Sequence, residues 1–273
     1  MKSFAIYDEE LQRKTPIGYL FYYEKAKSFI IELCDDLDEW DAPLLFQGMV
    51  RKGIYTILQE ASLMWVRERV IPSGRQNIGV ILKNHRLMEY DEMELLRISK
   101  GRCSQDSCYL VELRNEEFPD SLKKRMKQNI LDCFITGDEQ LVCMFRDDSV
   151  RKTDLSKLLF KYKDISHILK NKKLLDSARV GVGGYSVCFN ESIEIPAYAL
   201  RKTGELLPLK VDDFYSFISK NVIGTSKVCE MLQCSRQNLS YLVKEGKIEP
   251  VINGTKENMY MKGDVERIIS DGR

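Results

Sequence analysis

The stretch Thr225–Gly246, TSKVCEMLQCSRQNLSYLVKEG, contains two apolar patterns of helical spacing on either side of a short break. Thr225 or Ser226 precedes the first pattern and Ser235 precedes the second. Such hydroxyl residues cap helices because the side-chain oxygen accepts hydrogen bonds from amide groups left free at a helix start. The stretch therefore predicts two short helices joined by a tight turn at Gln233 and Cys234.

The second predicted helix covers residues 236–245. Leu239, Leu242 and Val243 share one face of it, and polar side chains project elsewhere. Gly246 is expected to end this helix, because glycine adopts the left-handed conformation of a helix terminus without steric cost.

A turn and a third helix follow this pair of helices. The turn 253–255, which begins Asn-Gly, lies between the apolar runs 250–252 and 258–260, and this pattern predicts a hairpin. Asp264 is expected to cap a closing helix. Two short helices, a hairpin and a closing helix match a winged helix-turn-helix, whose second helix enters the major groove of DNA.

Polar side chains at the start of the second helix suit base recognition. Arg236 can donate two hydrogen bonds to guanine, and Gln237 and Asn238 can pair with the donor and acceptor edge of adenine. Other polar residues nearby are expected to hold phosphates. The predicted DNA-binding residues are Thr225, Ser235, Arg236, Gln237, Asn238, Tyr241, Lys244, Lys256 and Lys262.

Three segments of this module, 224–232, 234–237 and 243–248, resemble the excisionase and MerR-type DNA-binding family. The resemblance covers about a fifth of the chain and implies a winged helix-turn-helix that binds double-stranded DNA. It departs from the family at 258–260, where Asn-Met-Tyr stands in place of arginines. The eight basic and seven acidic residues from Asn221 onward nearly balance, which predicts weak binding by a single copy and favours a homodimer.

The N-terminal part predicts a small sheet followed by helices. Strands are expected at 4–7, 17–22 and 28–33. An apolar pattern of near-helical spacing runs from Ala42 to Trp65, and further helices are expected at 77–84 and 91–98.

Several packing and turn residues of this part resemble the N-terminal subdomain of HipA-type toxin kinases. They include residues 17–20, 43–53 and 95–96. In that family the piece precedes a kinase core or restrains the kinase as a separate protein. The resemblance therefore implies a HipA-like toxin kinase as a partner.

The middle part is rich in predicted strands, at 130–136, 141–146 and 150–153, followed by a helical stretch and a glycine turn at 181–184. A phosphate-binding loop is the alternative for this turn, but the Lys-Ser/Thr that should follow is missing, so a hairpin is favoured. Residues 141–148 and 179–187 resemble the bacterial domain of unknown function DUF2442. That family is recurrently joined to helix-turn-helix modules, and the resemblance implies no activity.

The composition narrows the classes of function. Forty-two basic against 41 acidic residues give a formal net charge of +1, so any DNA contact must come from a local patch. The apolar runs are shorter than a membrane span, which predicts a cytoplasmic protein without a membrane partner. The eight cysteines lack the two-residue spacing of a zinc knuckle, and neither a metal nor another cofactor is expected.

The expected molecule is an α+β protein of three parts: a small α+β domain at 1–122, a strand-rich domain at 123–208, and a linker helix with a winged helix-turn-helix at 209–273. The expected function is that of a sequence-specific transcriptional regulator, the antitoxin or repressor of a toxin–antitoxin or defence locus. No catalytic residues are expected, since no nucleophile or acid pair stands at usable spacing. The alternatives are a divergent HipA-related enzyme and a protein-interaction module that restrains a partner kinase.

Overall fold

A computed structural model describes residues 1–113, 118–190 and 192–270. The chain divides into two compact units. The first contains residues 1–147 and 151–205, and the second contains residues 148–150 and 206–273. Helices and antiparallel sheets occur together, which confirms the α+β class. Within the described ranges, no helix has the length and apolarity needed to cross a membrane.

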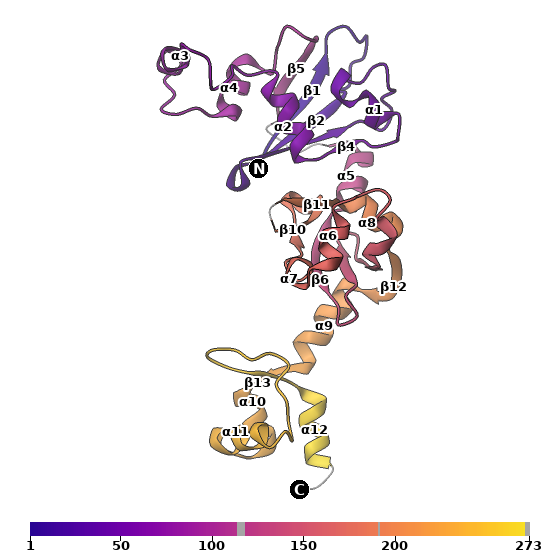
Figure 1. Ribbon diagram of the computed structural model, residues 1–273, viewed down its shortest axis with the longest axis vertical. Helices are drawn as coiled ribbons and strands as arrows, with labels where there is room; N and C mark the ends of the chain where they lie inside the picture. The colour runs from indigo at the N-terminus through magenta and orange to yellow at the C-terminus, as the bar shows by residue number, and fades with distance from the viewer. Residues whose placement is uncertain (114–117, 191, 271–273) are drawn as a thin grey trace. The chain divides into compact units, whose positions relative to one another are not determined.

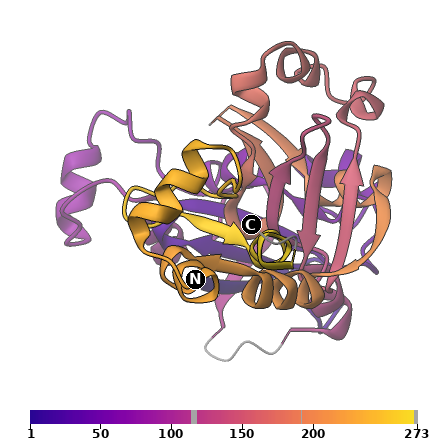
Figure 2. The ribbon, with the colours of Figure 1, turned by 90° about the horizontal axis from the view of Figure 1, so that it is seen from below.

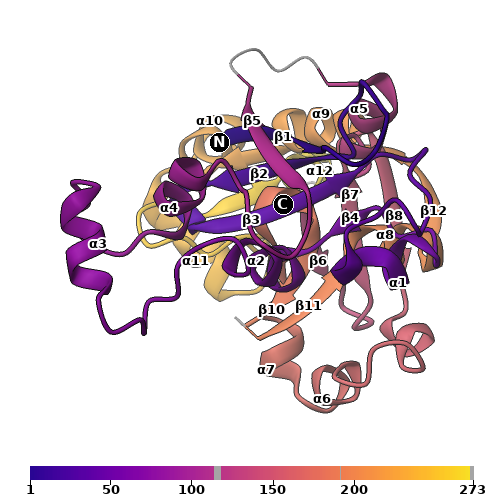
Figure 3. The same ribbon diagram turned by 90° about the horizontal axis from the view of Figure 1, so that it is seen from above.

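The first unit begins with a five-stranded antiparallel sheet in the order β4-β3-β2-β1-β5 (Figure 3). Its strands are β1 (Lys2–Asp8), β2 (Gly18–Tyr23), β3 (Ser28–Leu33), β4 (Thr56–Ile57) and β5 (Cys108–Glu112). The first three confirm the strands expected from the sequence. The edge strand β5 was not predicted.

Short helices lie between the strands of this sheet in the chain: η1 (Glu24–Ala26), η2 (Leu44–Phe46), α1 (Gln47–Val50), α2 (Gln59–Arg67), α3 (Ile78–Asn84) and α4 (Glu92–Ser99). The helices α2 and α4 cover one face of the sheet, with Trp65, Leu95 and Leu96 in the core (Figure 1). The predicted helices at 77–84 and 91–98 are confirmed as α3 and α4, and Asp91 caps α4 by accepting from the amide of Glu94.

The expectation of a helical pattern from Ala42 to Trp65 is wrong in its middle. Gly53 has a left-handed φ of +69°, and the chain then pairs Ile57 with Ile31 of β3 before α2 begins. The apolar residues of this segment therefore reach the core from three short helices, η2, α1 and α2, and from strand β4.

The opposite face of the sheet is also covered. Phe118, Leu122 of α5 (Asp120–Met126) and Tyr185 pack there against Phe21 and Ile30. Because both faces are buried, every residue of β3 is buried, and the strand lacks the alternation of a half-exposed strand.

Two further sheets follow in the chain. One has the order β12-β8-β7-β6 and the other the order β11-β10-β9. Figure 2 shows β6, β7 and β8 as adjacent magenta and pink arrows. The strands are β6 (Ile130–Ile135), β7 (Leu141–Phe145), β8 (Ser149–Thr153), β9 (Arg179–Val180), β10 (Ser186–Phe189), β11 (Ile193–Pro196) and β12 (Glu205–Lys210). The helices are η3 (Leu155–Leu158), α6 (Ile165–Lys170), α7 (Lys172–Leu175), η4 (Val182–Gly184) and α8 (Ala197–Thr203).

The strands expected at 130–136, 141–146 and 150–153 are confirmed as β6, β7 and β8. Asp148, in the turn before β8, has a left-handed φ of +68°. The glycine run 181–184 joins the antiparallel strands β9 and β10, so the hairpin interpretation is confirmed. Strands β11 and β12 and helix α8 were not predicted.

The second unit contains α9 (Val211–Asn221), β13 (Val222–Gly224), α10 (Thr225–Leu232), α11 (Arg236–Lys244), β14 (Met259–Met261) and α12 (Lys262–Ser270). Strand β13 pairs with β14 in an antiparallel ribbon. Apolar residues of α10, α11, α12 and β14 form one small core, of which Val228, Leu239, Tyr260 and Val265 are members.

Two local expectations for this unit are wrong, and a third holds only in part because the two runs pair but the turn between them is not tight. Gly224 occupies the N-cap position of α10 without a side-chain cap, because the hydroxyl of Thr225 donates to the carbonyl of Asn258 instead. Asp264 lies inside α12, which begins two residues earlier at Lys262.

The third concerns the Asn-Gly hairpin. Ile252 pairs with Met259 in an isolated bridge, and the loop between them is wider than a two-residue turn, with the side chain of Asn258 accepting from the amide of Gly254. Met259 also pairs with Gly224 in β13, a strand that was not predicted.

Candidate functional site

The helices α10 and α11 have the geometry expected of a helix-turn-helix. Gln233 ends α10 in the left-handed conformation, with a φ of +50°. The hydroxyl of Ser235 then caps α11 by accepting from the amide of Asn238 at 3.2 Å. Gly246, with a φ of +68°, follows the end of α11 as predicted, and the amide of Lys247 donates back to the carbonyl of Leu242 at 2.9 Å.

The polar residues of α11 divide between two sides of the helix. Leu239 and Leu242 are buried in the core, so the opposite side faces solvent. Gln237, Tyr241 and Lys244 follow the i, i+4, i+7 spacing of one face and are all exposed. Together these three side chains form the outer face of α11.

Arg236 points to a different side, toward α10. Its guanidinium donates to the hydroxyl of Ser226 at 3.0 Å. Arg236, Thr225 and Lys256 line one depression of about 470 Å³, together with Ser240 of α11. Of the predicted residues, the structure thus brings these three together at the depression and places Gln237, Tyr241 and Lys244 on the outer face.

Three predicted residues remain to be placed. Ser235 is the cap of α11, and Asn238 is exposed beside it. Lys262 is the first residue of α12 and forms an ion pair with Glu266 at 3.2 Å. Lys244 and Lys256 have no carboxylate within 4.0 Å in the part of the chain that the structure describes.

Glu257 is a member of this site that sequence reasoning missed. It lies in the loop before β14 and lines the same depression. One of its carboxylate oxygens accepts from the amide of Ser226, in the first turn of α10, at 3.4 Å. A carboxylate is favourable at a helix N-terminus, where amides are unpaired, and it occupies a position that also suits a phosphate. The signal in the sequence was an acidic residue next to Lys256 in the expected wing.

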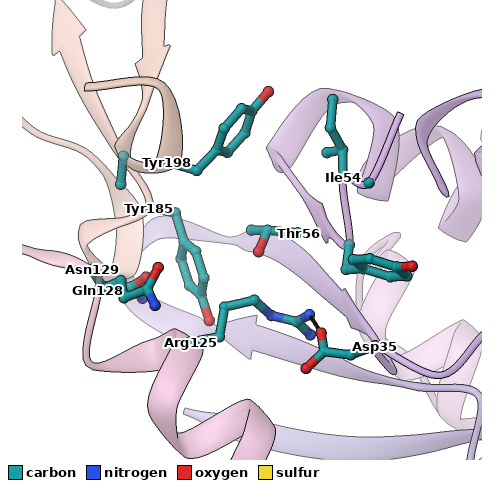
Figure 4. A pocket seen from close by; sticks show the side chains of 11 residues that line it. Asp35, Ile54, Thr56, Arg125, Gln128, Asn129, Tyr185 and Tyr198 are labelled. Carbon is teal, nitrogen blue, oxygen red and sulfur yellow. Dashed lines mark hydrogen bonds and ion pairs between the residues drawn. The ribbon is translucent and has the colours of Figure 1, made fainter. Parts of the chain in front are cut away.

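A second candidate site lies within the first unit, around a cavity of about 230 Å³. Asp35, Thr56, Arg125, Asn129, Tyr185 and Tyr198 are among the residues that line it. Figure 4 shows Arg125 reaching across to the carboxylate of Asp35, with which it forms an ion pair, and Tyr185 beside them. None of these residues was predicted from the sequence to belong to a functional site.

Two residues that line this cavity, Thr56 and Arg125, contact a fully buried carboxylate, that of Glu32 in β3. Its side chain has no exposed surface, Arg125 forms an ion pair with it at 2.7 Å, and the hydroxyl of Thr56 donates to it at 2.9 Å. Burial raises the pKa of Glu32 to about 7, although the charge of Arg125 and the hydrogen bond from Thr56 act in the opposite direction. Burial also raises the pKa of the Tyr185 hydroxyl.

The cysteines and histidines provide no third site. The eight cysteines are free thiols, and burial raises the pKa of several, including Cys34 to about 11. Across the described residues, no three side chains of His, Cys, Asp or Glu gather into a group that could hold a metal ion.

Comparison with family profiles, with curated proteins and with solved structures finds no match to this chain. The resemblances to excisionase and MerR-type proteins, to DUF2442 and to HipA-type kinases therefore stay predictions from the residues.

Proposed function

We propose that the second unit binds double-stranded DNA through α11 and that the chain is a sequence-specific transcriptional regulator. The observation that carries the proposal is the exposed outer face of Gln237, Tyr241 and Lys244 on a helix whose start is fixed by Ser235. Side chains of these types recognise bases and phosphates, and the second helix of a helix-turn-helix presents them to the major groove.

The two sides of α11 are proposed to do different work. Gln237 and Arg236 lie in the first turn, the part of a recognition helix that contacts bases. Lys244 and Tyr241 lie further along and suit phosphates. Arg236 donates to Ser226 through one nitrogen, and we propose that its other donors bind guanine. Lys256, on the wing side of the depression, is proposed as a phosphate contact, whereas the ion pair of Lys262 makes it a weaker candidate.

The near balance of charge in this unit determines how tightly it is expected to bind DNA. Glu257 places a negative charge at the N-terminus of α10, and Lys227 is paired with Glu230 at 2.9 Å. Both contacts reduce the positive charge that this unit can offer to phosphates. We therefore propose that a single copy binds weakly and that the functional form is a homodimer. The setting proposed from the HipA-like resemblance is a toxin–antitoxin or defence locus, with a HipA-like toxin kinase as a further partner.

The test is a titration of the full chain against a fluorescent duplex at several salt concentrations. Binding whose affinity falls as salt rises, with a small slope, supports few phosphate contacts. Replacement of Lys244 by Ala should lower the affinity for all duplexes alike and reduce the salt slope by about 1. Glu245→Ala, at the neighbouring exposed position, is the matched control and should not weaken binding. A chain that binds no duplex at low salt would contradict the proposal.

An enzyme is the competing class of function, and we propose that the chain is not one. Glu32 has the perturbed pKa that is common in catalytic carboxyls, but its side chain is fully buried and contacts Arg125 and Thr56. We assign this group a structural role. Thermal-shift measurements with ATP and magnesium test the alternative, since robust stabilisation together with phosphate release would favour a HipA-related enzyme.

A further inference from the structure

Two cysteines lie at the C-terminal end of α10, where the chain turns toward α11. Gln233 has a left-handed φ of +50°, and its amide donates to the carbonyl of Glu230 at 3.2 Å. The amide of Cys234 donates to the carbonyl of Cys229 at 3.0 Å. These two hydrogen bonds define a Schellman motif, in which the side chains at the two ends of the longer bond frequently contact one another. Cys229 and Cys234 occupy these two positions.

The thiols of Cys229 and Cys234 are both free and partly buried against the small core of the second unit. Burial raises the pKa of the Cys229 thiol, the neighbouring Cys234 raises this pKa further, and the charge of Arg236 lowers it. A backbone hydrogen bond of 3.0 Å keeps the two Cα atoms within about 7 Å of each other, the largest spacing that a disulfide bridges. The two thiols are therefore positioned to react with each other.

The chain contains another pair of cysteines with the same sequence spacing, Cys103 and Cys108, in different surroundings. The Cys103 thiol donates to the carboxylate of Asp106 at 3.7 Å, and the Cys108 thiol donates to that of Asp8 at 3.7 Å. Burial, and then the charge of Asp106, raise the pKa of Cys108 well above its usual range. Because the thiolate is the reactive form of cysteine, this pair is the unreactive counterpart of the pair in α10.

We propose that Cys229 and Cys234 form a reversible disulfide that fixes the turn between α10 and α11. Cys234 directly precedes Ser235, the cap of α11, so the bond would hold the start of α11 against the end of α10. The inference goes beyond DNA binding, because it concerns the conformation of the helix-turn-helix and does not depend on what α11 contacts.

The oxidant for this reaction is a small disulfide, for which oxidised glutathione is the probe. The thiolate of one cysteine attacks a sulfur of the probe, the S–S bond of the probe breaks, and one glutathione leaves as a thiolate. The thiolate of the second cysteine then attacks the protein sulfur of the mixed disulfide and expels the other glutathione. The two protons of the cysteine thiols pass through solvent to the two glutathione thiolates. The protein thus loses two electrons, which the probe gains.

The first test follows the thiols of the full chain in buffers with graded ratios of reduced to oxidised glutathione. After the remaining thiols are alkylated, trypsin releases peptide 228–236, which contains Cys229 and Cys234, and peptide 103–114, which contains Cys103 and Cys108. Mass spectrometry should find an internal disulfide in peptide 228–236 at ratios that leave peptide 103–114 fully alkylated. Oxidation of peptide 103–114 first overturns the proposal, as does a peptide 228–236 that stays alkylated or ends as a glutathione mixed disulfide.

Single substitutions test the role of the second thiol. In Cys234→Ser, the reaction of Cys229 should stop at the mixed disulfide with glutathione, because no neighbouring thiol resolves it. Cys103→Ser is the matched control and should leave the oxidation of peptide 228–236 unchanged. If Cys229 in the Cys234→Ser chain forms no mixed disulfide and stays reduced, it is not accessible to the probe, and the proposal fails.

Hydrogen exchange of the full chain tests whether the disulfide fixes the turn. Oxidation should slow the exchange of amides in α10 and α11 by about tenfold, because a cross-link restricts the opened states of the segment that it closes. Amides of β1, β2 and β3 should exchange at the same rate in both forms. A disulfide that forms without slowing α10 and α11 would contradict a fixed turn. An oxidised chain with slowed exchange that binds no duplex would contradict only the proposed function.

Discussion

The two compact units place their polar side chains in opposite ways. In the first, Glu32 and Arg69 are almost completely buried, with side-chain exposures of 0% and 1%, and each has a charged partner. In the second, the polar residues of α11 lie outside a small apolar core. Because a buried charge is tolerated only when it is paired, these two buried residues are expected to stabilise the first unit. The polar residues of the second unit can be changed without unfolding it, so their substitution should affect binding.

Replacement of Arg69 by Ala should give the largest effect. The guanidinium lies 3.6 Å from the centre of the Trp65 ring, donates to the carbonyl of Trp65 and forms an ion pair with Asp106. Loss of these contacts should lower the free energy of unfolding by about 3 kcal/mol, measured by urea denaturation. Arg67→Ala, which removes an exposed arginine from the same segment, should cost less than about 1 kcal/mol. Equal effects of the two changes would break the comparison between buried and exposed polar residues.

The buried carboxyl of Glu32 predicts a pH-dependent stability. Its pKa is about 7 in the folded chain and near 4.5 when the chain is unfolded, so the folded state binds the proton more tightly. The stabilisation from protonated Glu32 is complete below about pH 4.5 and is lost as the pH rises through about 7. Relative to Glu32→Gln, the wild type should therefore lose on the order of 2–3 kcal/mol between pH 4.5 and 8.

The midpoint of thermal unfolding, measured at several pH values for wild type and Glu32→Gln, gives this difference directly. Glu10→Gln changes an exposed carboxyl and should follow the wild type at every pH. Parallel curves for the wild type and Glu32→Gln would show that Glu32 is ionised throughout this range.

In the second unit, Arg236→Ala should affect binding and spare folding. We expect a loss of about 1–3 kcal/mol of DNA affinity, greatest for duplexes with guanine at the contacted position. The urea midpoint should stay near that of the wild type, since the side chain is exposed and its described contact is with Ser226. If Arg236→Ala instead lowered the urea midpoint and left DNA affinity unchanged, the side chain would stabilise the fold and would not bind DNA, contrary to the comparison of the two units.

The smallest effect is expected from Ser235→Ala. The hydroxyl of Ser235 satisfies the amide of Asn238 at the start of α11, and loss of such a cap costs about 1 kcal/mol. Ser240→Ala makes the same change inside α11, where alanine is a good helix former, and should not destabilise the unit. Chemical denaturation of both variants, followed by far-ultraviolet circular dichroism, measures the difference.

Local signals in the sequence predicted much of the fold. Ser235 and Gly246 marked the two ends of α11, and the apolar runs marked β1, β2 and β3. Elements whose partners are distant in the chain were missed. Strand β13 has three residues and is defined by its pairing with β14, and the pattern from Ala42 to Trp65 was interrupted by the pairing of Ile57 with Ile31. The division of the chain into three domains stays a prediction.

Prediction of the candidate sites from the sequence failed for the same reason, namely that some contacts join residues distant in the chain. The exposed face of α11 follows from helical spacing alone, so Gln237, Tyr241 and Lys244 could be named in advance. Glu257 and Glu32 could not be named in advance, because each contacts a partner that is distant in the sequence and that folding brings close. The amide that Glu257 meets is 31 residues away along the chain. Arg125 reaches Glu32 from α5, in a part of the sequence for which no element was predicted.

The central claim is that α11 recognises DNA sequence, and selection from a randomised duplex library tests it most directly. The full wild-type chain should enrich one motif, and the combined variant of Arg236→Ala, Gln237→Ala and Lys244→Ala should lose that enrichment while it remains folded. Failure of the wild type to enrich any motif, or enrichment of the same motif by the variant, would contradict the account.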